Sequence, residues 1–143
     1  MTSSITATAT TSGSKWNIGL WVAQIVLAAL YGMAAYIKLL MSPAELVQMG
    51  LVWVESSSIV FVRGIGFVEL LGVIGLILPA ATRIKPELTT YAAMGLLAIQ
   101  GIAIPFHMFR GEFEALPFNL IYVALAVFVL WGRTRKSPIT PRA

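Results

Sequence analysis

Four long apolar runs dominate the chain, separated by short polar segments. A helix needs about 20 mainly apolar residues to cross the hydrocarbon core of a bilayer. The runs are too long and continuous for barrel strands, and backbone in lipid must satisfy its hydrogen bonds within its own segment. The pattern therefore predicts an all-α bundle of four transmembrane helices, over residues 16–40, 59–81, 88–108 and 117–131.

The segments between the apolar runs predict tight connections. Residues 43–50 follow Ser42 and begin with proline, which is typical of a helix start, and we expect one short interfacial helix there. Residues 82–87 predict a hairpin, in which Pro86 suits the first turn of the third long helix. The sequence indicates neither a repeat nor a second folded domain.

Both ends of the chain are polar and are predicted to be disordered. Residues 1–14 are rich in serine and threonine, and residues 134–143 are short and basic. Neither segment has enough apolar side chains to form a packed core. The four-helix transmembrane domain is therefore expected over residues 15–133.

Composition supports a membrane protein and argues against a nucleic-acid partner. Of the 143 residues, 58% are hydrophobic and 11% are charged, whereas a soluble domain has about 25% charged residues. No nucleic-acid-binding motif accompanies the net charge of +4. The absence of cysteine excludes disulfide bonds and thiolate ligands from this chain.

Basic residues are distributed unevenly between the two ends of the predicted bundle. Seven lie at the end that carries both termini: Lys15, Arg83, Lys85, Arg133, Arg135, Lys136 and Arg142. The other end has Lys38, Arg63 and Arg110 beside several glutamates. Because lysine and arginine accumulate on the cytoplasmic side, both termini are predicted to be cytoplasmic.

Small and polar residues collect on one stripe of each predicted helix, and bulky aliphatic residues occupy the rest. Helix positions spaced by three, four or seven residues share a face. The four stripes are Gln24, Ala28, Tyr31, Ala35 and Lys38; Val62, Gly66, Glu69 and Val73; Ala93, Leu96, Gln100, Ala103 and His107; and Asn119, Tyr122, Ala126, Val129 and Arg133. Such stripes let helices approach closely and keep polar groups away from lipid.

Four ionisable side chains lie within the predicted spans: Lys38, Arg63, Glu69 and His107. An ionised side chain at the centre of a span costs on the order of 3 kcal/mol. Arg63 and Glu69 are about 9 Å apart along one helix and about 120° apart around it, so we do not expect them to pair. Glu69 is expected to find a partner on another helix, to bind a ligand, or to hold a proton.

These four side chains predict a polar pocket within the membrane that opens on the outer side. Lys38, Arg63 and His107 are placed at the outer ends of their helices, and Glu69 near the bilayer midplane. Three further residues are expected to line the pocket: Tyr31, Gln100 and Asn119. The excess positive charge at its mouth favours an anionic or electron-rich ligand.

A structural role is the alternative for each of these residues. Arg63 and Glu69 would then belong to an interhelical network that fixes packing, and Lys38 would extend to the lipid headgroups. His107 is the only histidine. With no cysteine and one deep carboxylate, it makes a poor metal ligand set, and no metal site is predicted.

Six short segments match a known family in their order and spacing. They are residues 35–39 (AYIKL), 63–69 (RGIGFVE), 75–83 (GLILPAATR), 92–96 (AAMGL), 106–107 (FH) and 131–133 (WGR). Over about residues 18–133, the chain resembles the DoxX-like family of small four-helix membrane proteins. The resemblance implies a multi-pass protein of the bacterial inner membrane, with Lys38, Arg63, Glu69 and His107 at polar positions of the family.

The resemblance also implies a link to redox chemistry. Some relatives are associated with thiosulfate:quinone oxidoreduction, and others with a membrane oxidoreductase complex in oxidative-stress defence. The leading hypothesis is a quinone- or anion-binding subunit that works with a membrane or soluble oxidoreductase partner. Two alternatives stay open: a non-catalytic scaffold whose buried charges orient the helices, and a small transporter, which would require a homo-oligomer.

Overall fold

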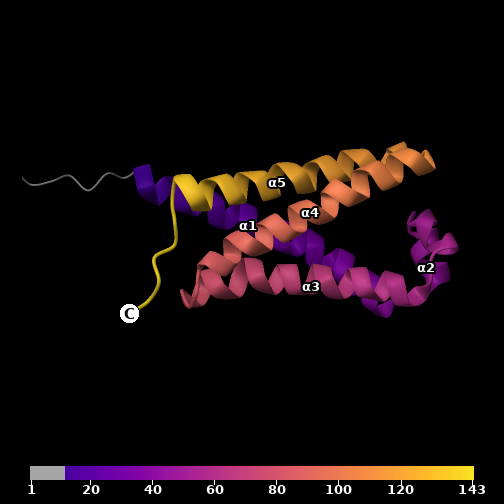
Figure 1. The fold of residues 1–143 in the computed structure, drawn as a ribbon, viewed down its shortest axis with the longest axis horizontal. Helices are drawn as coiled ribbons and strands as arrows, with labels where there is room; N and C mark the ends of the chain where they lie inside the picture. Colours follow the sequence, from indigo (N-terminus) through magenta and orange to yellow (C-terminus); the bar gives the residue numbers. More distant parts are fainter. Residues whose placement is uncertain (1–11) are drawn as a thin grey trace, which may run out of the picture.

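The computed structural model of the protein describes residues 12–143, so most of the predicted N-terminal tail lies outside the described residues. Four long helices make up the molecule (Figure 1): α1 (Ser12–Leu40), α3 (Ile59–Thr82), α4 (Glu87–Arg110) and α5 (Leu116–Arg135). Shorter helical segments connect them: α2 (Pro43–Gln48) and the 3₁₀ helices η1 (Val52–Ser56) and η2 (Phe113–Ala115). Residues 12–143 contain no β-strand, and the prediction of an all-α fold is confirmed.

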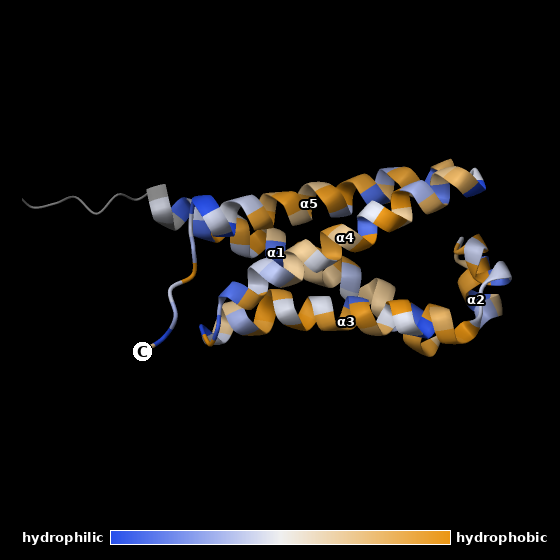
Figure 2. Ribbon diagram, viewed as in Figure 1, coloured by the Kyte–Doolittle hydropathy of each residue, from blue (hydrophilic) through white to orange (hydrophobic). Residues whose placement is uncertain are grey.

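All four long helices are long and apolar enough to cross a membrane. Each begins and ends within about one helical turn of its predicted span. Apolar residues make up much of the four long helices (Figure 2), and many of their side chains are exposed; Phe109, for example, is 92% exposed. In water such a surface would be unstable, whereas lipid solvates it. The protein is therefore a multi-pass membrane protein whose long helices contact the bilayer.

Successive long helices run in opposite directions, so the bundle has two distinct ends (Figure 1). Helix α1 packs against α3 and α5, and α4 packs against the same two helices. The start of α1, the turn between α3 and α4 and the end of α5 lie at one end, which we call the termini end. The opposite end carries α2, η1 and η2, and we call it the α2 end. That the termini end faces the cytoplasm stays a prediction.

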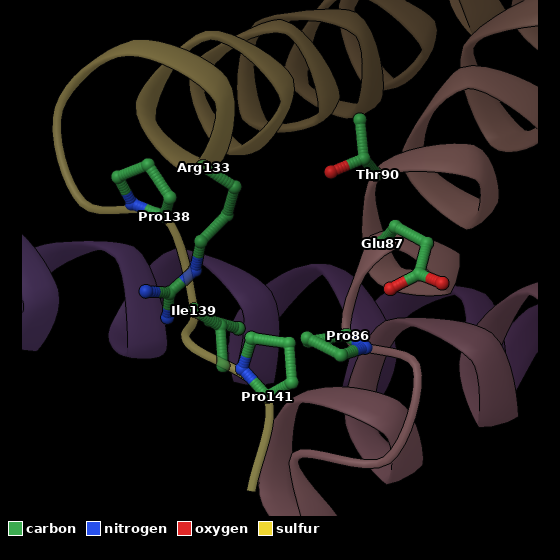
Figure 3. Close-up of a pocket in the computed structure, with 7 residues that line it drawn as sticks. All are labelled: Pro86, Glu87, Thr90, Arg133, Pro138, Ile139 and Pro141. Atoms are coloured by element: carbon green, nitrogen blue, oxygen red, sulfur yellow. The ribbon is translucent and has the colours of Figure 1, made fainter.

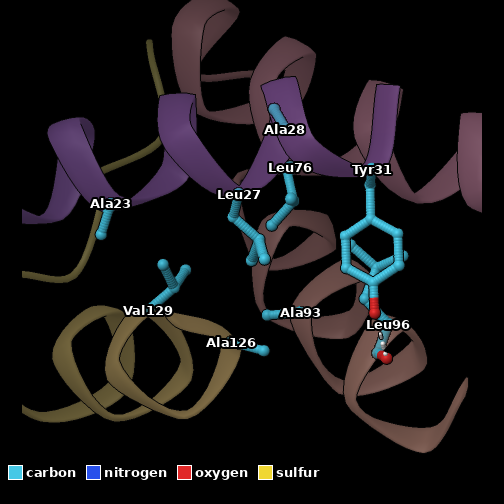
Figure 4. Packing of buried hydrophobic residues seen from close by; sticks show 9 residues of the cluster. All are labelled: Ala23, Leu27, Ala28, Tyr31, Leu76, Ala93, Leu96, Ala126 and Val129. Carbon is cyan, nitrogen blue, oxygen red and sulfur yellow. Dashed lines mark hydrogen bonds between the residues drawn. The ribbon is translucent and has the colours of Figure 1, made fainter. Parts of the chain in front are cut away.

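The core consists of small and aliphatic side chains from all four long helices. Figure 4 shows its buried members: Ala23, Leu27, Ala28, Tyr31, Leu76, Ala93, Leu96, Ala126 and Val129. Two glycines allow close packing around it, because a Cβ at Gly72 or Gly132 would collide with the side chain of Leu96 or Leu20. Small residues at helix contacts are the usual way in which membrane helices gain packing contacts.

The connection between α1 and α3 forms a small apolar cap at the α2 end. Leu46, Trp53 and Val54 of the connection pack with Ile37 of α1 and Val62 of α3, and all five are buried. A capping box starts α2: the backbone N–H of Glu45 donates to Ser42 Oγ, and the Glu45 carboxylate accepts from the Ser42 backbone N–H at 2.7 Å. The helix predicted over residues 43–50 thus ends at Gln48, and the remainder of the connection continues into η1.

Helix α5 continues to Arg135, and the C-terminal segment then turns back along the termini end. The backbone N–H of Arg142 donates to the carbonyl oxygen of Arg83 at 3.0 Å. Pro138, Ile139 and Pro141 lie close to the start of α4, where they line a cavity. The predicted disorder of residues 134–143 in solution stays a prediction.

Candidate functional site

Three buried polar side chains occupy the inward face of α1 at intervals of seven residues: Gln24, Tyr31 and Lys38. Seven residues correspond to about two helical turns, so successive members are about 10 Å apart along the axis. Each side chain bonds to the side chain of a different helix of the bundle: Gln24 to Arg133 of α5, Tyr31 to Gln100 of α4 and Lys38 to Glu69 of α3. The polar stripe of α1 therefore organises three separate networks.

Lys38 and Glu69 form a buried ion pair between α1 and α3. The Lys38 Nζ lies 2.9 Å from each Glu69 oxygen, and within the described part of the chain its one other hydrogen bond is a long one of 3.4 Å to the Ala34 carbonyl. The Lys38 and Glu69 side chains are 10% and 6% exposed. Gly66, one turn before Glu69, permits this approach, because a Cβ there would lie 3.0 Å from Lys38 Cβ. The partner of Glu69 thus comes from another helix.

Arg63 contacts the backbone at the end of α1 and not the Glu69 carboxylate. Its Nη1 donates to the Lys38 carbonyl oxygen, and its Nη2 donates to the Met41 carbonyl oxygen at 2.8 Å. The last carbonyls of a helix have no intrahelical donor, and they carry the negative end of the helix dipole. Arg63 therefore caps the turn of α1 that contains Lys38 and fixes the position of this lysine.

The three predicted lining residues lie together in a chain of hydrogen bonds across α1, α4 and α5. Asn119 Nδ2 donates to Gln100 Oε1 at 2.6 Å, and Gln100 Nε2 donates to the Tyr31 hydroxyl at 2.8 Å. The Tyr31 hydroxyl in turn donates to the Leu96 carbonyl at 3.0 Å. The Tyr122 ring packs against Tyr31, with ring centroids 4.5 Å apart. These bonds place the chain two turns along α1 from the Lys38 ion pair.

His107 belongs to a third network at the α2 end. Its Nδ1 lies 2.7 Å from a Glu112 oxygen, and Arg110 Nε donates to the other Glu112 oxygen at 2.6 Å. Arg110 also donates to Ser56 Oγ at 3.0 Å, which ties the end of α4 to η1. Partial burial works to raise the pKa of Glu112, but the hydrogen bonds from Arg110 and His107 outweigh it and lower this pKa.

The four ionisable candidates lie toward the α2 end of the bundle, but they do not form one cluster. Lys38 and Glu69 pair with each other, Arg63 supports the backbone beside them, and His107 bonds to Glu112. Two cavities are described, and neither is lined by any of these four residues. One is an apolar groove between α3 and α4, and the other lies at the termini end. The ligand-binding role of the four residues stays a prediction.

Sequence reasoning missed a fourth network, which surrounds Arg133 at the termini end. Arg133 Nε donates to Gln24 Oε1 at 2.5 Å, and Nη1 donates to Asn17 Oδ1 at 2.8 Å. Gln24 Nε2 also donates to the Leu76 carbonyl at 2.8 Å. Arg133 was counted with the residues that set topology, and it was also placed on the inward stripe of its helix with Ala126 and Val129, in agreement with its burial. Its partners were not predicted.

Within residues 12–143, no three histidine or acidic side chains are grouped as a metal site would require.

Comparison with known proteins identifies the family. No curated protein and no solved structure matches the chain. The model of the DoxX-like family matches residues 22–129, a range that holds Lys38, Glu69 and the other candidates. This match extends over most of the chain, and the chain therefore belongs to the DoxX-like family.

Proposed function

We propose that the protein is a ligand-binding membrane subunit of a redox-related system, and that a quinone or a small anion binds at Lys38 and Glu69. The observation that carries the proposal is the ion pair itself. Its two charges lie in two helices long and apolar enough to span a membrane, and among residues 12–143 each has only the other as a charged partner. Ionisable residues at such positions are rare, and they commonly mark ligand sites or proton pathways.

A contribution to stability does not by itself explain why this ion pair is present. Desolvation of two charges offsets most of their attraction, and a buried ion pair can often be replaced by apolar side chains without loss of stability. Lys38 directs its ammonium group almost entirely to Glu69. A ligand oxygen that accepted a hydrogen bond from Lys38 would take the place of the carboxylate, and Glu69 would then be neutralised by a proton. Ligand binding would thus be coupled to proton uptake.

The other candidates would support this step. Arg63 would hold the end of α1 in place, since it donates to the Lys38 and Met41 carbonyls. His107 would exchange protons at the α2 end through its contact with Glu112. The chain has no cysteine, and we propose that a partner oxidoreductase exchanges the electrons. We place the protein in the bacterial inner membrane with its termini in the cytoplasm, as the basic residues favour.

A non-catalytic scaffold is the second candidate, and one observation favours it. Lys38, Arg63 and Glu69 all have protein partners, and together these bonds join α3 to the last turns of α1. In that case the charges would fix the mutual orientation of the two helices, and no ligand would be needed.

Mass spectrometry of small molecules that co-purify with the protein from native membranes separates the two. The variants are Glu69→Gln and, as a matched control, Glu114→Gln, which makes the same chemical change at an exposed position between α4 and α5. A near-stoichiometric quinone or anion, absent from Glu69→Gln and retained in Glu114→Gln, supports the binding function. No bound molecule in the wild type, together with a less stable Glu69→Gln variant, refutes it in favour of the scaffold.

A further inference from the structure

The Arg133 guanidinium is a buried charge without a counter-charge. Arg133 is 4% exposed and lies in the last turn of α5. Its three hydrogen bonds go to the neutral oxygens of Gln24, Asn17 and Ser137, the last of these at 3.2 Å. Within residues 12–143, no carboxylate lies at ion-pair distance from it, and its Nη2 nitrogen has no hydrogen-bond partner.

This arrangement is electrostatically incomplete. An arginine side chain stays protonated in proteins, so it cannot avoid the desolvation of its charge by losing a proton. Buried charges are normally paired with an opposite charge, and buried N–H groups normally have an acceptor. The ring of Trp21, 5.6 Å from the Arg133 Cζ, offers a cation–π contact but no acceptor for Nη2.

A cavity of about 310 Å³ adjoins this side chain at the termini end. Figure 3 shows the Arg133 side chain leaving α5 with its guanidinium beside Ile139 of the C-terminal segment, while Glu87 and Thr90 of α4 lie on the opposite side of the cavity. The other lining residues are Pro86, Glu87, Thr90, Pro138, Ile139 and Pro141. A water molecule occupies about 30 Å³ in the liquid, so the cavity has room for a phosphate group and for atoms attached to it.

The charges around the cavity favour an anion. Six other basic residues lie at the termini end: Lys15, Arg83, Lys85, Arg135, Lys136 and Arg142. Glu87 is the one acidic residue among the described residues of this end, and it lines the cavity without reaching Arg133. Its carboxylate would oppose an anion, so the binding strength should rise when Glu87 is neutralised.

We propose that this cavity binds a phosphate group, and that Arg133 is its main contact. Once the guanidinium turns from its buried position toward the cavity, two phosphate oxygens would accept from its Nη1 and Nη2 edge, in the bidentate geometry that arginine forms with phosphate. The weak bond from Nη1 to the Ser137 carbonyl would be released, and the Thr90 hydroxyl on the opposite wall would donate to a third oxygen. The group comes either from the headgroup of an anionic phospholipid in the leaflet at this end or from free phosphate.

This site is independent of the function proposed above. Arg133 lies at the termini end, whereas Lys38 and Glu69 join α1 to α3 toward the α2 end. Loss of a quinone or anion from Glu69→Gln would therefore leave phosphate binding at Arg133 unchanged, and the reverse also holds.

The test is native mass spectrometry of the full-length protein, delipidated in a phosphate-free detergent and titrated with three probes. The probes are phosphatidylglycerol, inorganic phosphate and a diacylglycerol that lacks the phosphate group. Arg133→Gln removes the proposed contact, and Arg135→Gln is the matched control, since it removes the same charge from an exposed side chain two residues further on. Glu87→Gln removes the opposing carboxylate.

We expect one phosphatidylglycerol to bind to the wild type, about tenfold or more weakly to Arg133→Gln and within about twofold of wild type to Arg135→Gln. Glu87→Gln should bind it several-fold more tightly, which also provides a test if Arg133→Gln does not fold. Binding of inorganic phosphate with the same dependence on Arg133, in the absence of lipid binding, identifies free phosphate as the source. Equal losses in Arg133→Gln and Arg135→Gln, equal binding of diacylglycerol, or no gain in Glu87→Gln overturn the proposal.

Discussion

The Lys38–Glu69 pair should be energetically coupled without being needed for stability. Lys38→Met leaves a carboxylate with no donor, and Glu69→Met leaves an ammonium whose remaining bond is the 3.4 Å contact to Ala34. Removal of one partner from a buried pair costs about 3–5 kcal/mol in soluble proteins, and insertion scales give about 3 kcal/mol for a charge in a span. The Lys38 side chain is 10% exposed and can extend toward the interface. We therefore expect each single variant to lose about 2–3 kcal/mol.

The double variant Lys38→Met/Glu69→Met removes both charges and should lie within about 1 kcal/mol of the wild type. The coupling free energy of the cycle would then be about 3 kcal/mol or more, well above the average of about 0.6 kcal/mol for interhelical hydrogen bonds in membrane proteins. Unfolding in mixed micelles with increasing sodium dodecyl sulfate, followed by circular dichroism, gives the four free energies. A double variant that loses as much as the two single variants combined would show that the charges do not interact, and the reasoning would be wrong.

Three further predictions concern the caps and packing of the bundle. Gly132→Ala introduces a Cβ against Leu20 and should lower the unfolding free energy by about 1–3 kcal/mol. Gly101 has open space around it, so Gly101→Ala should not lower the unfolding free energy. The same unfolding assay compares the two variants. Arg63→Lys loses the two guanidinium hydrogen bonds to the end of α1 and should lower the unfolding free energy by about 1–2 kcal/mol in that assay. An unchanged unfolding free energy would contradict a capping role. The pKa of Glu112 is lowered, so its contribution is present above about pH 4.3 and is lost as the pH falls through the folded-state value. Glu112→Gln should therefore flatten the stability profile below about pH 4.3, and an unaltered profile would exclude this contribution.

Hydrophobic length and periodicity were sufficient to predict the helices and their inward faces. Each apolar run had to be a helix in lipid, because its backbone can satisfy its hydrogen bonds only in that way. Spacing then placed Gln24, Tyr31 and Lys38 on one face, and all three are buried. Depth along the helix followed from the rise per residue, which is why Glu69 was expected to need a partner on another helix, a ligand or a proton.

Partner choice was harder to predict, since it depends on how the helices cross and on short local turns. Arg63 was expected to present its charge to a ligand, but the end of α1 brings two backbone carbonyls within its reach. His107 was grouped with Lys38, whereas the turn after α4 brings Glu112 beside it. Periodicity carries no information on either contact. Arg133 is buried partly by residues after α5, which have too few apolar side chains to predict packing.

The seven-residue spacing on α1 has a consequence for biosynthesis. The three partners of α1 lie progressively further along the chain: 31 residues separate Lys38 from Glu69, 69 separate Tyr31 from Gln100, and 109 separate Gln24 from Arg133. At about 5–20 residues per second, translation delivers these partners several seconds apart. The first helix thus enters the membrane with its polar face unpaired, and the contacts close in sequence from its C-terminal end to its N-terminal end. Gln24 Nε2 can already donate to the Leu76 carbonyl of α3, but its side-chain oxygen receives Arg133 last. A chain that stops before Arg133 would therefore leave the bundle open at the end where synthesis began.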